Sequence, residues 1–147
     1  MSVAVRPLAA GDRAHWGRLW KAYLAFYRTE RPGEHYDSYF ARLLRHDPAD
    51  MQGLIAEADG RPAGLAHYLL HPHGWQPEPT CYLQDLYADP EARGTGVGRA
   101  LIEAVYAAAD AHGARGVYWT TAHDNHEARR LYDRVGTLTP FIKYARP

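Results

Sequence analysis

Hydrophobic and polar positions along the first part of the chain predict one strand followed by two helices. Alternation of valine with polar or small residues predicts a strand over residues 2–7, where a proline ends the run. Asp12 is placed to cap a helix in which tryptophan, leucine and tyrosine recur at helical spacing up to Tyr27. A second helix is predicted over residues 36–45. The aromatic stripe of the first helix is interpreted as core packing.

Three strands are predicted next, at residues 52–58, 63–70 and 80–88. Glycine and proline occur in both segments between them, as they do in hairpin connections. These strands are therefore expected to be neighbours in one sheet.

The remaining residues predict helices and strands in alternation. A helix is predicted over residues 97–111, a strand over 116–121, a helix between its cap Asn125 and Gly136, and a last strand over 138–145. The order β-α-α-β-β-β-α-β-α-β indicates an α/β (α+β) fold, in which a mixed sheet carries helices on both faces.

Composition narrows the class of protein. The 147 residues fit one domain, and 46% of them are hydrophobic and 23% charged, as in ordinary globular proteins. The 17 basic and 17 acidic residues give a formal net charge of zero, which disfavours a nucleic-acid-binding protein. No apolar run long enough for a membrane span and no secretory signal is visible, and the single cysteine, Cys81, cannot form an internal disulfide. We therefore expect a cytoplasmic protein.

The nine histidines do not predict a metal site. Their tightest cluster is His67, His71 and His73, which Pro72 interrupts. Zinc needs three or four ligands in tetrahedral geometry, and no helical pair with an intervening glutamate is present. These histidines are expected to be solvent-exposed loop residues, and no metal is expected.

A glycine-rich loop after the strand at 80–88 is the most informative segment. Gly94, Gly96 and Gly98 precede or open a helix, so the backbone can approach a ligand closely and the free N–H groups of the helix start can bind phosphate oxygens. Arg93 and Arg99 flank the loop and can bind a diphosphate. The loop therefore predicts a phosphate-bearing ligand, with a purely structural turn as the alternative.

Two better-known phosphate motifs do not fit this loop. The dinucleotide fingerprint has the spacing Gly-x-Gly-x-x-Gly after the first strand, with an acidic residue about 20 positions later. The loop here follows the fourth predicted strand and has the spacing Gly-x-Gly-x-Gly. No lysine follows it as in the other common phosphate-binding loop, so a nucleotide-binding protein is a distant alternative.

Residues 93–98, Arg-Gly-Thr-Gly-Val-Gly, match the Arg/Gln-x-x-Gly-x-Gly/Ala signature of the GNAT acetyltransferases. Downstream, Asn125-x-x-Ala128-x-x-x-Tyr132-x-x-x-Gly136 is similar to a second motif of that family at the expected distance. The resemblance covers residues 80–136 closely. Within the family, the strand Tyr-Leu-Gln-Asp-Leu-Tyr most resembles that of the diamine acetyltransferases and a related histone/polyamine-type branch.

The resemblance implies a single acetyltransferase domain over residues 1–147. It implies a mixed, mostly antiparallel sheet of about seven strands flanked by about four helices, with a further strand at the end of the order given above. The implied activity is transfer of acetyl from acetyl-CoA to a primary amine of a small molecule, such as a polyamine or amino acid, by direct attack in a ternary complex.

The resemblance also implies where acetyl-CoA, the co-substrate, binds. It is expected between the fourth and fifth strands, with its diphosphate on the glycine loop and its pantetheine arm paired with the fourth strand. The residues implied in binding are Leu86, Tyr87, Ala88, Arg93, Gly94, Thr95, Gly96, Val97, Gly98, Arg99, Asn125 and Ala128.

Two residues are expected to carry the proton transfers. Tyr132 stands where the family keeps the acid that protonates the leaving thiolate, although it could instead only pack against the cofactor. Asp85 is the first candidate for the base, because diamine acetyltransferases carry glutamate where this chain has Gln84. Neighbouring strand residues point to opposite faces, so a bulge decides which of the two side chains points inward.

Substrate residues are expected at Tyr27, Glu30, Gln84 and Tyr118, because carboxylates and aromatic faces suit a cationic amine. A protein or peptide amine as the acceptor and a non-catalytic CoA-binding sensing module are the alternatives. A nucleophilic role for Cys81 is not expected, since direct attack needs no covalent intermediate. Dimers are frequent in such folds, so a homodimer is included among the expected assemblies.

Overall fold

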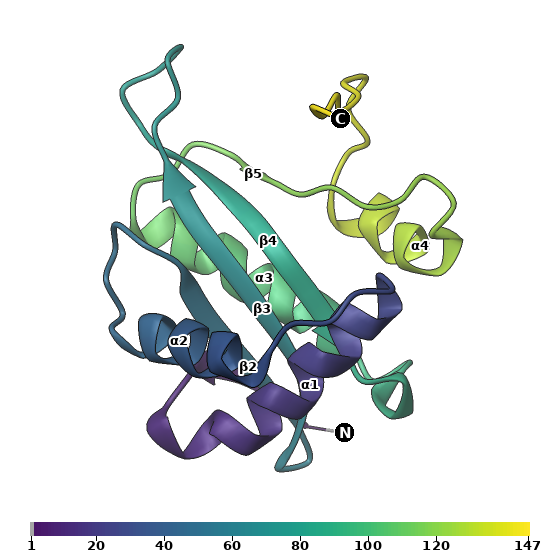
Figure 1. Ribbon diagram of the computed structural model, residues 1–147. Coiled ribbons are helices and arrows are strands. Elements are labelled where there is room, and N and C mark those ends of the chain that lie inside the picture. Colours follow the sequence, from purple (N-terminus) through teal and green to yellow (C-terminus); the bar gives the residue numbers. More distant parts are fainter. Residues whose placement is uncertain (1) are drawn as a thin grey trace.

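The computed structural model describes residues 2–147, which contain one five-stranded sheet whose strands follow chain order (Figure 1). The first four strands pair antiparallel, and β4 and β5 pair parallel. The strands are β1 (Val3–Pro7), β2 (Gln52–Ala58), β3 (Arg61–His71), β4 (Thr80–Ala88) and β5 (Val117–Tyr118).

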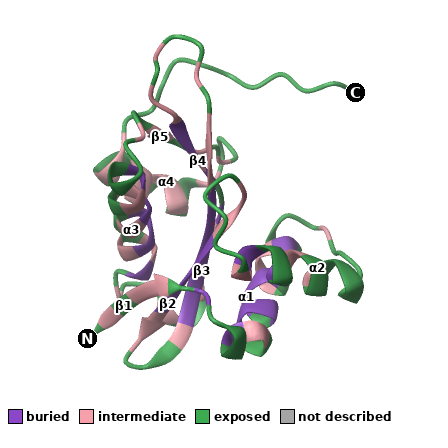
Figure 2. Ribbon diagram, turned by 90° about the vertical axis from the view of Figure 1, so that its left-hand side faces the viewer, coloured by how far each residue is buried: buried purple, intermediate pink, exposed green. Residues whose placement is uncertain are grey.

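Helices cover both faces of this sheet. In Figure 2, α1 and α2 lie on one side of the strands, and α3 lies on the other with α4 beside it. The predicted α/β class with helices on both faces is confirmed. None of the helices in residues 2–147 combines the length and the apolar character that a bilayer span requires. The helices are α1 (Arg13–Phe26), α2 (Gly33–Leu44), α3 (Val97–Ala111) and α4 (His126–Val135), with short 3-10 turns at Ala10–Asp12 and Pro90–Ala92.

The core under α1 and α2 is aromatic. Trp16 is fully buried, and its ring stacks on Trp20 at 5.4 Å between ring centroids. Phe40 of α2 and Leu65 of β3 complete this layer. The interpretation of the aromatic stripe as core packing is confirmed for its buried residues up to Leu24 but is wrong for Tyr27, which is 47% exposed because it follows the last turn of α1. The buried residues pack α1 over β3 and β4.

The core under α3 is aliphatic, and α3 lies very close to the sheet. A Cβ added at Gly64 of β3 would lie 2.7 Å from the backbone oxygen of Tyr87 and 2.8 Å from Cγ1 of Val97. Only glycine leaves room for this approach. The contact places the first turn of α3, and therefore the glycine loop before it, directly beside the end of β4.

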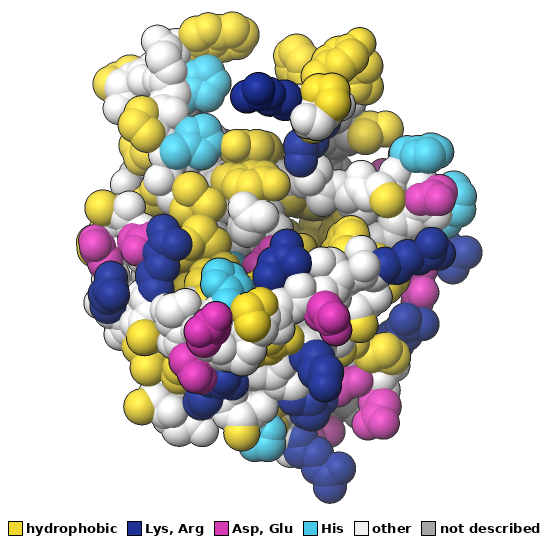
Figure 3. Space-filling model, viewed as in Figure 1, with side chains coloured by type: hydrophobic (Ala, Val, Ile, Leu, Met, Phe, Trp, Pro, Cys, Tyr) yellow, Lys and Arg dark blue, Asp and Glu magenta, His cyan; other side chains and the backbone are white. Residues whose placement is uncertain are grey.

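The predicted last strand over residues 138–145 is wrong, because this segment belongs to no strand in the structure. The predicted strand over 116–121 is reduced to two residues, so the sheet has five strands rather than about seven. Alternating apolar residues become a strand only where another strand offers hydrogen-bond partners. Figure 3 shows hydrophobic side chains on two projecting segments, the β3–β4 connection and the C-terminal segment. The exposed large hydrophobic residues in these two segments are Trp75, Leu138, Phe141, Ile142 and Tyr144.

Both predicted helix caps occupy the N-cap position without capping through their side chains. The Asp12 carboxylate instead accepts hydrogen bonds from the Ala9 amide at 2.8 Å and from Arg6 at 2.7 and 2.9 Å. The Asn125 amide donates to Oγ1 of Thr121 at 3.1 Å. The sequence therefore located these helix starts but not the bonds that hold them.

Candidate active site

A β-bulge in β4 decides which of two neighbouring side chains points inward. Asp85 pairs with His67 of β3, whereas Leu83 pairs with Tyr68, so Gln84 has no partner in β3. The extra residue turns the Asp85 side chain to the α1–α2 face, where it is buried, and leaves Gln84 exposed. Asp85 is therefore the inward-facing carboxylate, whereas the Gln84 side chain is exposed.

His67 contacts Asp85 directly. Its Nδ1 lies 2.7 Å from Oδ2 of Asp85, and the indole N–H of Trp16 donates to its Nε2 at 2.9 Å. The expectation that the histidine cluster is solvent-exposed is wrong for His67, which is 0% exposed. The expectation failed because His67 lies within β3, on the face that α1 and α2 cover, and not in a loop.

Three tyrosines lie close enough to Asp85 for its charge to raise their pKa values. Burial raises the pKa of Tyr23 of α1 and Tyr39 of α2, and the negative charge of Asp85 raises both further. Burial, then Asp85 and then Tyr82 of β4, raises the pKa of Tyr27 in the same way. These hydroxyls are neutral donors at working pH, and the rings offer faces to a cation.

The predicted substrate residue Tyr118 extends this aromatic cluster along β5. Its ring lies 4.8 Å from that of Tyr82, and its hydroxyl lies 2.7 Å from Nε2 of His71. Tyr118 is therefore joined to the tyrosines around Asp85 through Tyr82. Sequence reasoning missed Tyr23, Tyr39 and Tyr82, whose helical or strand spacing looked like ordinary core.

Strands β4 and β5 separate soon after they pair. Their ladder consists of Cys81 with Val117 and Tyr82 with Tyr118. Further along β4, Leu86–Ala88 pair with β3 on one edge and have no strand partner among the described residues on the other. A free strand edge of this kind can bind an extended group that carries amides, as expected for a pantetheine arm.

The glycine loop lies next to this free edge. Gly94 has φ +77° and Gly96, the N-cap of α3, has φ +86°, a conformation that residues with a Cβ rarely adopt. A Cβ at either position would meet nothing within 4 Å, so the outer side of the loop is open. Gly98 has a packing role, since its Cβ would lie 3.1 Å from Leu131 of α4. The free N–H groups of the first turn of α3 face this region without intrahelical partners.

The two arginines of the loop form exposed ion pairs. Arg93 lies 3.1 Å from Glu127, and Arg99 lies 2.9 Å from Glu103 on the same helix. All four side chains are more than half exposed, and such pairs contribute about 0–1 kcal/mol. Both guanidinium groups can therefore turn to a phosphate at little cost. Thr95 donates its hydroxyl to the Ala92 carbonyl, and Val97 is buried, so these residues can offer a ligand only backbone groups.

Tyr132 of α4 is both packed and protonated. Its ring lies 5.5 Å from that of Trp119 in an edge-on arrangement. Burial, with a smaller effect from Tyr27, raises the pKa of Tyr132 to about 12. The same half-buried helix face carries Ala128, whereas the cap residue Asn125 bonds to Thr121. Packing and proton donation are thus compatible for Tyr132, and Tyr27 lies near enough to link it to the cluster around Asp85.

Two other predicted features lie apart from this cluster. Glu30 lines a cavity of about 380 Å³ with Tyr36 and Lys21, and no hydrogen bond or ion pair joins it to Asp85 among residues 2–147. Burial raises the pKa of Cys81 to about 11, so its thiol is not an activated nucleophile.

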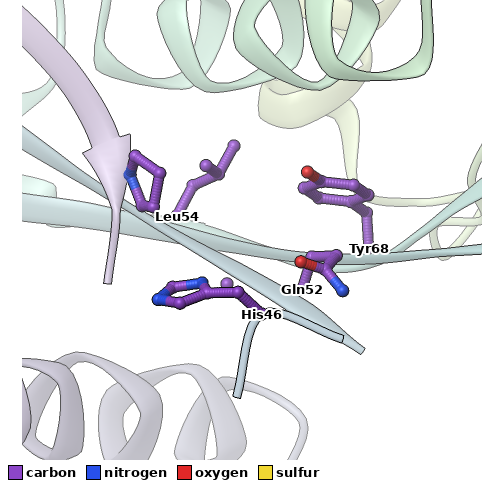
Figure 4. A pocket seen from close by; sticks show the side chains of 6 residues that line it. His46, Gln52, Leu54 and Tyr68 are labelled. Carbon is purple, nitrogen blue, oxygen red and sulfur yellow. The ribbon is translucent and has the colours of Figure 1, made fainter. Parts of the chain in front are cut away.

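A second cavity, of about 320 Å³, lies at the start of β2 and is lined by His46, Gln52, Leu54 and Tyr68 among others (Figure 4). Neither cavity includes Asp85, Tyr132 or the glycine loop. The candidate site is therefore the region along β4 between Asp85 and the glycine loop, outside both cavities. Within the described part of the chain, no three histidine, cysteine or acidic side chains are grouped closely enough to hold a metal ion.

The model of the acetyltransferase (GNAT) family matches residues 16–137. The chain is 40% identical over 147 residues to a D-amino-acid N-acetyltransferase of Saccharomyces cerevisiae, covering 98% of this chain and 90% of the relative. It is 29% identical over 143 residues to an uncharacterized N-acetyltransferase of Bacillus subtilis, covering 95% and 94% of the two chains.

Solved structures share the fold at lower identity. An aminoglycoside N-acetyltransferase, AAC(6')-Iy, in complex with a CoA-containing bisubstrate analogue, superposes with a TM-score of 0.84 at 21% identity, covering 100% of this chain and 99% of that one. A ribosomal-protein-alanine N-acetyltransferase from Brucella melitensis superposes with a TM-score of 0.79 at 21% identity, covering 99% of both chains. The names of these two neighbours refer to different acceptors, an aminoglycoside and a ribosomal protein, so the fold alone does not name the acceptor.

Proposed function

This chain belongs to the GNAT acetyltransferase family, and on that basis we propose that it transfers acetyl from acetyl-CoA to the primary amine of a small molecule. The observation that carries this proposal is the position of Asp85. It is a buried carboxylate ringed by tyrosines, and it lies on the strand whose free edge and following glycine loop suit acetyl-CoA.

Backbone groups would hold most of the acetyl-CoA molecule. The free edge of Leu86–Ala88 would pair with the amides of the pantetheine arm, and the N–H groups from Gly94 to Arg99 would bind the diphosphate. Arg93 and Arg99 would add charge-assisted bonds. A strand N–H near Leu86 would face the thioester oxygen, where a fixed donor stabilises the charge that develops during attack.

The reaction requires an alkylammonium nitrogen to lose two protons in all. Asp85 takes the first, so that the free amine attacks the thioester carbon while the C–S bond breaks. Attack leaves the nitrogen positively charged with two N–H groups, and it loses one of these protons to solvent to give the amide. Tyr132 protonates the departing thiolate, and solvent then returns a proton to Tyr132. Asp85 then passes its proton to solvent. An alkylamine with a pKa of about 10.4 needs such a base at neutral pH.

Several observations support a small, cationic acceptor. The tyrosines Tyr23, Tyr27, Tyr39 and Tyr82 offer aromatic faces and hydroxyls beside a carboxylate, which suits an ammonium group. The yeast relative acts on D-amino acids, and this is the first class to test. The likeness of the β4 motif to polyamine enzymes makes polyamines the second class, with Gln84 as the departure. A cytoplasmic location and a homodimer stay predictions.

The proposal is tested by calorimetric titration with acetyl-CoA and by thiol release over an amine panel. The panel contains D-amino acids and their L-enantiomers, polyamines, an aminoglycoside and a peptide with a free N-terminus. Acetyl-CoA binding with thiol release on one small-molecule class is expected. Release on the peptide alone would favour a protein acceptor, and binding without release on any amine would favour a CoA-binding sensing module.

A further inference from the structure

His67 lies at the centre of a buried hydrogen-bond chain drawn from three elements. Trp16 of α1 donates its indole N–H to Nε2 of His67 at 2.9 Å, and Nδ1 of His67 lies 2.7 Å from Oδ2 of Asp85. His67 is 0% exposed, and Trp16 is also 0% exposed. Water therefore does not reach the imidazole ring from any side.

The chemistry of the three groups fixes the direction of this chain. An indole nitrogen can only donate, so Nε2 of His67 must be an unprotonated acceptor. A neutral imidazole with a bare Nε2 carries its hydrogen on Nδ1, and this hydrogen points to the Asp85 carboxylate. A proton added at Nε2 would oppose the Trp16 N–H donor at 2.9 Å inside the core. The geometry therefore assigns His67 one neutral tautomer.

Because His67 is a neutral donor, it does not neutralise the negative charge of Asp85, and the carboxylate can still accept a proton. Among residues 2–147, the one side chain within ion-pair distance of Asp85 is His67, and no arginine or lysine pairs with it. A cation at this place would hold the carboxylate in its charged form and weaken it as a base. The neutral Nδ1–H instead fixes the orientation of Oδ2, so the other oxygen can face an incoming amine.

The other groups around the pair do not supply a charge. Burial and the charge of Asp85 raise the pKa of Tyr23 of α1 and of Tyr27, the residue after α1, so both are neutral phenols. Burial and the charge of Asp85 raise the pKa of Tyr39 of α2, so this phenol is also neutral. Arg42 lowers the same pKa and Asp50 raises it, both by smaller amounts than burial. His35 stacks on the outer side of Tyr39 at 6.0 Å and is exposed, and the Arg13 guanidinium lies over the Trp16 ring at 5.6 Å.

We propose that Trp16 and His67 are positioning residues, which keep the Asp85 carboxylate oriented and free of a counter-cation so that it can take the proton of the attacking amine. This role rests on the proposed acetyl transfer. The hydrogen-bond chain itself can be measured without any activity, so the two can fail separately.

The first experiment is nitrogen-15 NMR of the histidine side chains, with the His67 signals assigned from a His67→Gln variant. The expected signature is a protonated Nδ1 and a bare Nε2 that do not change between about pH 5 and 8, where an ordinary histidine changes charge. In Trp16→Phe, Nε2 loses its donor and can take up a proton, so the His67 signals are expected to move with pH.

Trp20→Phe is the matched control. Trp20 stacks on Trp16 in the same core, but its indole N–H is buried without a hydrogen-bond partner among the described residues. The same loss of an indole ring is therefore expected to leave the His67 signals as in the parent protein. His67 signals that move with pH in the parent protein, or equal changes in both tryptophan variants, would overturn the proposed hydrogen-bond chain.

The second experiment is the pH profile of kcat/KM with the amine found active. In Trp16→Phe, protonated His67 would pair with Asp85 as a cation and lower the pKa of the Asp85 carboxyl. Each pKa unit by which the base is weakened is expected to cost about tenfold in kcat/KM, and the loss should grow below neutral pH. His67→Asn, which keeps an N–H donor, is expected to retain more kcat than His67→Leu. Profiles of unchanged shape, with all variants equally active, would overturn the positioning role. If the NMR signature is as expected but the protein acetylates no amine, the proposed function is wrong and the hydrogen-bond chain of Trp16, His67 and Asp85 is still supported.

Discussion

The hydroxyl of Tyr106 on α3 donates a hydrogen bond of 2.7 Å to the backbone carbonyl of Val135, at the end of α4. This bond joins the helix that begins at the glycine loop to the helix that carries Tyr132. Because α3 packs against β3 and β4, the bond helps to fix the position of Tyr132 relative to β4. Together with the packing of Leu131 of α4 against Gly98 of α3, this bond connects the two halves of the candidate site.

Removal of this hydroxyl is expected to loosen α4. Tyr106→Phe leaves the ring in place and the Val135 carbonyl without its partner, so it is expected to lower the free energy of unfolding by about 0.5–1.5 kcal/mol. Chemical denaturation measures this loss. The exposed Tyr144→Phe is the control and is expected to leave stability unchanged. Equal stability of both variants would show that the α3–α4 bond contributes nothing.

Tyr132→Phe is expected to lower kcat by about 10²-fold or more, because the leaving thiolate loses its proton donor. The Kd of acetyl-CoA, measured by calorimetry, should stay within a few-fold because the ring remains. Burial raises the pKa of Tyr132 to about 12, so the parent enzyme should lose no activity from ionisation of this group up to about pH 10. An unchanged kcat would leave Tyr132 a packing residue.

Asp85→Asn is expected to lower kcat/KM by about 10²- to 10⁴-fold at pH 7, since the amide cannot take the proton of the amine. The side-chain oxygen still accepts the hydrogen bond of His67, so the fold is expected to survive. The loss should shrink as pH rises toward the pKa of the amine, about 10.4, where the free amine is already present. The exposed Asp110→Asn serves as the control, and a defect in Asp85→Asn that does not change with pH would argue against a base.

Gly96→Ala tests the phosphate site. Gly96 has φ +86°, so alanine is strained there by about 1–2 kcal/mol, and its methyl group would project into the space where the diphosphate is expected. Weaker acetyl-CoA binding is expected in calorimetry. Gly74→Ala is the matched control, because that loop glycine has neither a positive φ nor a nearby atom within 4 Å of an added Cβ. Equal affinities would place the diphosphate elsewhere.

Asp12→Asn tests the acid sensitivity of the fold. The bidentate bond from Arg6 holds the pKa of Asp12 below its usual 3.8, so the carboxylate stabilises the folded state above that value. This contribution is lost as pH falls through the lower folded pKa. At pH 7 the variant is expected to lose about 1.5–3 kcal/mol of unfolding free energy, and the difference should disappear in strong acid.

The control for Asp12 is Asp37→Asn. Asp37 pairs with Arg13 at 2.8 Å, but its side chain is 75% exposed, so its loss is expected to cost less than about 1 kcal/mol. Equal losses for the two variants, measured by denaturation at pH 7, would show that burial does not distinguish the two ion pairs.

Local pattern was sufficient where an element is defined by its own residues. Three elements were predicted with the bounds that the structure has, namely the strands 52–58 and 80–88 and the helix 97–111. This was possible because the spacing of apolar residues that distinguishes strands from helices can be observed within a contiguous segment. The glycine loop and the motif around Tyr132 were visible for the same reason. The sequence by itself thus determined the fold class and the family, and it located the glycine loop at which we propose that acetyl-CoA binds.

Only the tertiary structure decided what depends on neighbours distant in sequence. The bulge at Gln84 turns Asp85 inward because the register between β3 and β4 shifts by one residue there, and no pattern within β4 predicts this shift. His67 meets Trp16 across 51 residues of chain, so the local sequence did not show that this position of the strand is covered by α1. The segment 138–145 alternates like a strand but finds no partner strand in its own chain. Strand pairing and buried polar contacts arise between segments, and this is why the local sequence could not predict them.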